Sequence, residues 1–132
     1  MSGVSNMKSK ETSFRVKRFE VEEKRRKVAD LEHMIREFEH MAVELDRQVQ
    51  SEEDRTGIKD RTHFAYSTLA KAAAQRRDNL RASIVNLQVK LETAVRERDD
   101  ACADLDKAAP DAQRDMDRLS RRPDHGTNLI VR

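Results

Sequence analysis

The side chains that could bind a metal ion form one stripe at four- and three-residue spacings. They are His33, Glu37, His40 and Glu44. Imidazole nitrogens and carboxylate oxygens on one helix face are a possible ligand set for a divalent cation such as zinc. The same spacings also produce weak side-chain pairs on a solvent-exposed helix surface. We interpret the stripe as such a surface, because the heptad register described below places it outside the contact between helices.

Other signatures of catalysis or cofactor binding do not occur in the sequence. It has no glycine-rich phosphate loop, no HExxH pair and no G-x-S-x-G turn. Cys102 is the only cysteine, which excludes an intrachain disulfide and a cysteine metal cluster and suits a reducing compartment. We therefore expect a protein that is not an enzyme, with no catalytic residues, no cofactor, no metal site and no small-molecule substrate.

Composition favours long helices over a compact core. The chain has 132 residues, of which 39% are charged, 36% hydrophobic and 4% aromatic, and its net charge is +2. This length allows one domain at most, and this charge excludes a bulk polycation for nucleic acid. The first ten residues, MSGVSNMKSK, lack the apolar core of a signal peptide, and no apolar run has the length of a membrane span. We expect a soluble, cytosolic protein.

Glycine and proline divide the chain into two long stretches. They occur only at Gly3, Gly57, Pro110, Pro123 and Gly126, so residues 4–56 and 58–109 contain no helix breaker. Two stretches of nearly equal length joined at one glycine predict a helical hairpin. Pairing of the two arms between different chains is the alternative.

Both stretches carry an apolar heptad pattern. In the first, one position of the repeat is Phe14, Val21, Val28, Ile35, Ala42 and Val49, and three residues later come Lys17, Lys24, Leu31, Phe38, Leu45 and Glu52. In the second, the positions are Tyr66, Ala73, Leu80, Leu87, Ala94, Ala101 and Ala108, with Ala70, Arg77, Ile84, Leu91, Arg98 and Leu105 four residues after the first six. This spacing is typical of a left-handed coiled coil.

The predicted fold is all-α, a long antiparallel two-helix coiled-coil hairpin with a short frayed C-terminal tail. The expected parts are a flexible leader over 1–9, helix one over about 10–53, a turn over about 54–61, helix two over about 62–109, and a short helix and disordered tail over 110–132. Asp60 or Thr62 is the expected cap of helix two, and Met116 and Leu119 lie on one side of the short helix.

Arg77 and Arg98 fall at inward positions of the second heptad pattern. A charge there destabilises the helix pair unless its stem packs and its head reaches water or a partner. We interpret the two arginines as residues that fix the helix register, or that mark a section where the seam is open to solvent. We favour both interpretations over a contact with another protein.

The N-terminal end is basic and carries Phe14 and Phe19 where the seam is otherwise polar. A basic, amphipathic helical tip with aromatic residues can dock in an acidic groove or ring. A segment that contacts tRNA or a membrane has a similar composition.

Two segments resemble a known family. They are MKSKETSFRVKRFEVEEKRRKVADLE, which begins at Met7, and HFAYSTLAKAAAQRRDNLRAS, which begins at His63. Both are similar to the corresponding segments of the flagellar type III export protein FliJ family, in its alphaproteobacterial form. The similarity covers roughly residues 7–109 and implies Met7 as the usual start. The ending PDAQRDMDRLSRRPDHGTNLIVR departs from the long helical ending of that family.

The resemblance implies a stalk-like coiled coil in the flagellar export apparatus. Its partners would be the export ATPase ring, the export gate membrane protein and export chaperones. Its location would be cytoplasmic, with peripheral association to the inner membrane at the flagellar base. Contacts with the ATPase would involve Phe14, Arg15, Lys17, Arg18 and Phe19, and contacts with the gate would involve Phe64, Tyr66, Leu69 and Ala73.

Two other functions fit a helical hairpin or a pair of long helices. A nucleic-acid-contacting arm needs a continuous basic face, and the interleaved acids Glu20, Glu22, Glu23 and Asp30 argue against one. We therefore expect no nucleic-acid partner. A generic homodimeric coiled-coil scaffold is the remaining alternative.

Overall fold

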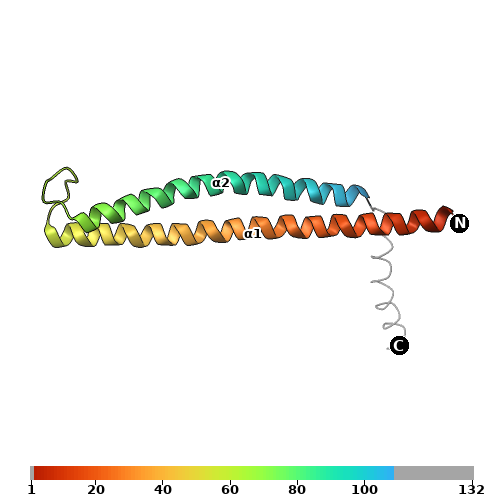
Figure 1. Ribbon diagram of the computed structural model, residues 1–132, viewed down its shortest axis with the longest axis horizontal. Helices are drawn as coiled ribbons and strands as arrows, with labels where there is room; N and C mark the ends of the chain where they lie inside the picture. Colours follow the sequence, from red (N-terminus) through yellow and green to blue (C-terminus); the bar gives the residue numbers. More distant parts are fainter. Residues whose placement is uncertain (1, 109–132) are drawn as a thin grey trace, which may run out of the picture. The chain divides into compact units, whose positions relative to one another are not determined.

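Two α-helices make up nearly all of the chain that the structure describes (Figure 1). The structure is a computed structural model that describes the backbone of residues 2–108 and the side chains of residues 8–108. Helix α1 runs over Ser2–Thr56 and helix α2 over Thr68–Ala108, with no strand in this part of the chain. Neither helix is long and apolar enough over these residues to cross a membrane.

The chain divides into two compact units. One is Arg26–Arg96, and the other contains Met1–Arg25 and Glu97–Arg132. Within Arg26–Arg96 the two helices lie side by side (Figure 1) and form two apolar clusters. One cluster joins an early part of α1 to a late part of α2, and the other joins a late part of α1 to an early part of α2. The helices are therefore antiparallel, which confirms the predicted all-α hairpin.

The core of this unit follows the predicted heptads. The first cluster contains Val28, Leu31, Ile35, Ile84, Leu87 and Ala94, and the second contains Leu45, Val49, Ala73 and Ala74. Ala74 is the one buried member of these clusters that lies outside the predicted positions. The methyl side chains of Ala73 and Ala74 let the two backbones approach closely near the loop, since helix separation depends on the side chains at the contact.

Arg77 is buried at its inward position and pairs across the helices. Its side chain is 10% exposed, and one guanidinium nitrogen donates to Asp46 Oδ1 at 2.7 Å. Asp46 also accepts a hydrogen bond from Arg81 at 2.9 Å, and the remaining Arg77 nitrogens reach Asp78. The hydrogen bond that Arg77 donates to Asp46 is the main reason why the pKa of Arg77 is raised. A buried charge that has lost its partner is strongly destabilising, so this contact favours the register in which Arg77 lies opposite Asp46.

The helix boundaries differ from the predicted ones around the turn. The loop covers 57–67, whereas the sequence predicted a turn over about 54–61 and a second helix from about 62. Ser67 caps α2: its Oγ accepts a hydrogen bond from the backbone N–H of Ala70 at 3.2 Å. The prediction of Asp60 or Thr62 as the cap is therefore wrong, because both lie within the loop.

The prediction for the N-terminal segment can be compared with the structure, whereas the prediction for the C-terminal segment cannot. Helix α1 begins at Ser2, within the segment 1–9 that the sequence predicted as a leader. The short helix and tail predicted over 110–132, with Met116 and Leu119, lie outside the described residues.

Gly57 ends α1 in the left-handed backbone region, with a φ of 74°. Its N–H donates to the Glu53 carbonyl at 2.8 Å, which closes the last turn of the helix. A Cβ at this position would meet no atom within 4 Å, so the backbone alone selects glycine.

Replacing Gly57 with alanine should destabilise the protein by about 1 kcal/mol, because an L-residue is strained in this conformation. Gly57→Asn should cost less, since asparagine tolerates the left-handed region. Thermal unfolding followed by circular dichroism would measure both changes. Equal losses for the two variants would show that some other contact selects glycine here.

Candidate functional site

The loop between the helices is held by hydrogen bonds within its own residues. Asp60 Oδ1 accepts bonds from the backbone N–H of Thr62 at 3.0 Å and from the Thr62 hydroxyl at 2.7 Å. These two bonds lower the pKa of Asp60, with a smaller effect from His63. The His63 N–H donates to the Asp60 carbonyl, and the Tyr66 N–H donates to the His63 carbonyl, each at 3.1 Å. The loop is thus a pair of successive tight turns.

Phe64 lies at the outer part of these turns and is 96% exposed. Its ring stacks on that of His63, with 4.7 Å between the centroids. The N–H of Ala65 donates to His63 Nδ1 at 3.0 Å, which orients the imidazole. An aromatic side chain exposed to this degree adds nothing to the core, so it is available for a partner.

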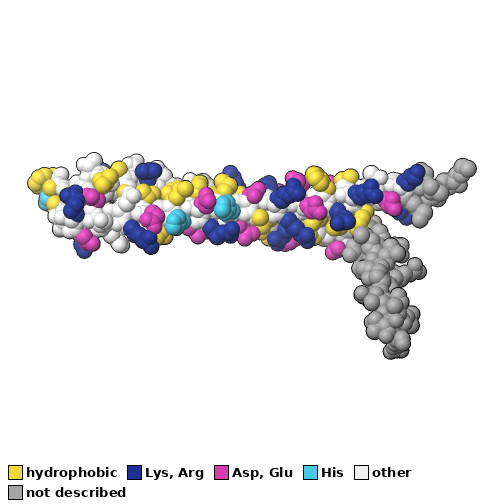
Figure 2. All heavy atoms as spheres, turned by 90° about the horizontal axis from the view of Figure 1, so that it is seen from below, with side chains coloured by type: hydrophobic (Ala, Val, Ile, Leu, Met, Phe, Trp, Pro, Cys, Tyr) yellow, Lys and Arg dark blue, Asp and Glu magenta, His cyan; other side chains and the backbone are white. Residues whose placement is uncertain are grey.

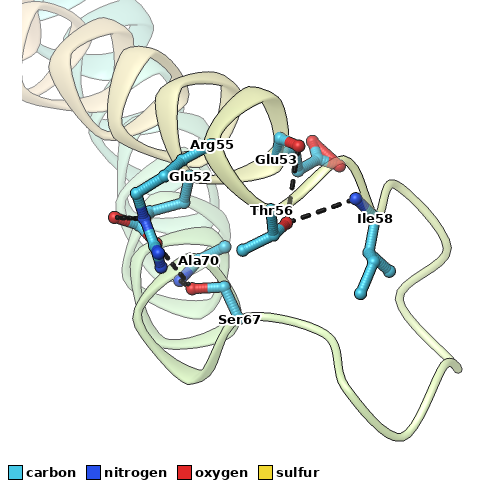
Figure 3. Close-up of polar contacts among 7 residues, drawn as sticks. All are labelled: Glu52, Glu53, Arg55, Thr56, Ile58, Ser67 and Ala70. Atoms are coloured by element: carbon cyan, nitrogen blue, oxygen red, sulfur yellow. Dashed lines mark hydrogen bonds and ion pairs between the residues drawn. The ribbon is translucent and has the colours of Figure 1, made fainter.

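A polar anchor ties the far end of the loop to α1 (Figure 3). The Ser67 hydroxyl donates to Glu52 Oε2 at 3.0 Å, while Arg55 binds the same carboxylate at 2.6 Å. The Arg55 bond is the main cause of the lowered pKa of Glu52, and the Ser67 bond adds to it. Glu52 raises the pKa of Arg55 in turn. The N-cap of α2 is therefore held in place by the last turns of α1.

The four residues for which the FliJ resemblance implies a contact with an export gate have different environments. Phe64 is exposed, and Leu69 is 59% exposed on the first turn of α2. Tyr66 lies in the loop and is half-buried. Ala73 is 4% exposed and belongs to the second apolar cluster, so it offers no surface to a partner. Of the four, only Phe64 and Leu69 are mainly exposed to solvent.

The Tyr66 hydroxyl is buried and has no hydrogen-bond partner in the described part of the chain. A shallow hollow beside Tyr66 is lined by Arg61, Lys71 and Asp78, among others. These neighbours belong to the loop and to the first turns of α2. Because an unpaired buried hydroxyl costs free energy, Tyr66 is held here by its ring and not by its polar group.

The five residues for which the FliJ resemblance implies a contact with an ATPase lie on α1, in the unit that contains Met1–Arg25. Phe14 and Lys17 are half-buried, whereas Arg15, Arg18 and Phe19 are exposed, Phe19 by 60%. The Arg18 guanidinium lies 5.9 Å from the centre of the Phe14 ring, a cation–π contact. Five residues on a helix correspond to a rotation of about 140°, so the two phenylalanines lie on different faces.

Two further features of this unit were not predicted from the sequence. Val16 is 51% exposed and adds an apolar side chain beside Phe19. Lys24, at a seam position, pairs with Glu97 of α2 at 3.1 Å. The pair explains how a lysine is tolerated in the seam, and only the antiparallel register brings the two residues together.

The histidine–carboxylate stripe does not converge on a metal site. His33 Nε2 lies 3.2 Å from Glu37 Oε1, both side chains being more than half exposed, and Glu44 pairs with Arg47. Among residues 8–108 no group of three or more histidine, cysteine or carboxylate side chains could hold a metal ion. On the face drawn in Figure 2, acidic and basic side chains alternate along the described residues.

Comparison with known proteins gives no relative: no family model matches the chain, and neither a curated protein nor a solved structure matches it.

The Glu52 anchor should make the stability of the hairpin depend on acid pH. The pKa of Glu52 is lowered from 4.5 in the folded protein, so its contribution is present above pH 4.5 and is lost as the pH falls through the lower, folded value. The difference in melting temperature between the wild type and Glu52→Gln should therefore shrink between about pH 5 and pH 3. A difference that stays constant over this range would exclude the anchor as its source.

Proposed function

We propose that the protein is a non-enzymatic stalk and adaptor of the flagellar type III export apparatus. In this role it links the export ATPase ring to the export gate and assists export chaperones. It acts on the cytoplasmic side and is held at the inner membrane through its partners. The proposal joins the resemblance of two sequence segments to the FliJ family with the exposure of particular side chains in the hairpin.

The observation that carries the proposal is the placement of the exposed aromatic side chains. Of the five phenylalanines and tyrosines, only Phe19 and Phe64 are classed as exposed. They fall in the two segments to which the resemblance assigns the ATPase and the gate. Exposed aromatic side chains are enriched in the parts of protein interfaces that carry most of the binding energy. Their positions therefore support two separate partner contacts.

The mechanism we propose is mechanical coupling and not chemistry. In Arg26–Arg96 the apolar clusters and the Arg77–Asp46 contact hold α2 against α1 in one register. A helix pair held in this way transmits a displacement along its length without a change in its own packing. Its partners would supply ATP hydrolysis and the membrane channel.

The segment with Phe14, Arg18 and Phe19 should bind the export ATPase of the same organism. Purified protein should raise the turnover of that ATPase, because the stalk favours the assembled ring. The triple variant Phe14→Ala, Arg18→Ala, Phe19→Ala should bind at least about tenfold more weakly, as expected on loss of aromatic and arginine contacts at an interface. Titration calorimetry and a steady-state ATPase assay would measure the two effects.

A matched control is Val85→Ala, Val89→Ala, since both valines are 58% exposed on another part of the protein. Circular dichroism should show the same helicity for both variants and the wild type. An ATPase rate that does not change at a saturating concentration of the protein would count strongly against the stalk function.

The second contact should depend on Phe64 and Leu69. Because these side chains are 96% and 59% exposed, replacing both with alanine should change the free energy of unfolding by no more than about 0.5 kcal/mol. The same variant should weaken binding to the cytosolic part of the export gate, measured by surface plasmon resonance. A large fall in melting temperature would instead mean that the two residues hold the loop together.

A further inference from the structure

Helix α1 has a wider apolar stripe than one partner helix can cover. Over 28–45 most of the apolar residues occupy three heptad positions: Val28, Leu31, Met34, Ile35, Phe38, Met41, Ala42 and Leu45, while Ala29 and Val43 lie at another. A two-stranded coiled coil needs two such positions, and three are typical of a helix with two neighbours in a bundle. The third position is the one left open here, with Met34 42% and Met41 47% exposed.

A groove between the helices runs beside this open position. It is lined by Phe38, Met41 and Leu45 from α1 and by Leu80 from α2, with polar side chains around them. Phe38 and Leu80 are only partly buried, although both pack against the core clusters. The groove therefore has an apolar floor that continues the core of Arg26–Arg96 out to the surface.

The two walls of the groove carry opposite charges. Glu44 is on the α1 side and Arg76 on the α2 side. Arg76 forms no ion pair among the described residues, and Glu44 has only a solvent-exposed partner, Arg47. Asp46, the acidic residue beside Arg77, is not available to a second molecule in the same way, because it already pairs with Arg77 and Arg81 within the hairpin. The groove thus carries Arg76 without an ion-pair partner among the described residues and Glu44 with only an exposed pair to Arg47 on its own helix.

We propose that the groove binds the same groove of a second copy of this chain, giving a two-fold symmetric bundle of four helices. With the two-fold axis along the groove, the groove of one copy meets the same groove of the other, and α1 of each copy faces α2 of the other. Glu44 of each copy then lies opposite Arg76 of the other copy, so the interface contains two such pairs. The arrangement covers Met41 and completes the three-position stripe as in a four-helix bundle. Each hairpin stays intact, and the proposal does not depend on any partner in protein export.

The mass of the protein in solution tests this proposal. The wild type should associate with a Kd of about 1–100 µM, so sedimentation equilibrium should show a mass that rises toward twice 15.3 kDa. Met41→Lys should weaken association at least tenfold, because it places a charge on the apolar floor. Val43→Lys is the matched control: Val43 is 47% exposed, like Met41, but does not line the groove.

The charges supply a second test that is specific for the two-fold arrangement. Glu44→Lys and Arg76→Glu should each give a monomer when alone, because each variant places like charges together in a symmetric pair. An equimolar mixture of the two should recover the dimer, since every pair is then of opposite sign.

Three results would overturn the proposal. They are a wild type that stays monomeric up to about 200 µM, equal weakening by Met41→Lys and Val43→Lys, and a mixture of the two charge variants that stays monomeric. Circular dichroism on each variant would show that the hairpin itself remains folded.

Discussion

The contact between Arg77 and Asp46 is the constraint on which the hairpin depends. The apolar positions repeat every seven residues, so sliding α2 by one heptad would keep most apolar side chains in apolar surroundings. The same slip would separate Arg77, whose side chain is 10% exposed, from Asp46 and leave it with Asp78 alone. Loss of one partner of a buried ion pair is strongly destabilising, so the slip is disfavoured although the apolar pattern tolerates it. The ion pair therefore favours one register of α1 against α2 within Arg26–Arg96.

The sequence was sufficient to predict the class of fold, because heptad periodicity and the spacing of glycine report directly on helix packing. Val28, Ile35, Leu45 and Leu87 are buried where the pattern placed them. The end of the turn was not predicted correctly. It depends on the hydrogen bond from the Ser67 hydroxyl to Glu52, and these residues are 15 apart in the sequence, so no local pattern indicates the contact. A serine three residues before Ala70 was the only local signal of the cap, and Asp60 offered a competing one.

The candidate site was predicted less completely than the fold, for a physical reason. Periodicity indicates which side chains face the other helix, but it does not say how far a loop residue projects into solvent. Phe64 is almost fully exposed, whereas Ala73, assigned to the same surface, belongs to the core. The heptad pattern itself placed Ala73 inward, so its own position argued against a surface role. The opposite charges of Glu44 and Arg76 at one groove became visible only when the register was known.

The short connection between Glu52 and Ser67 also has a consequence for how the chain folds. Successive contacts between α1 and α2 enclose longer and longer segments, from the Glu52–Ser67 pair near the loop to the cluster that joins Val28 with Ala94. The entropy lost on closing a segment grows with its length, so the pairs nearest the loop form at the lowest cost. Each closed pair then shortens the segment that the next must order. The hairpin should therefore form as a zipper that starts at the turn.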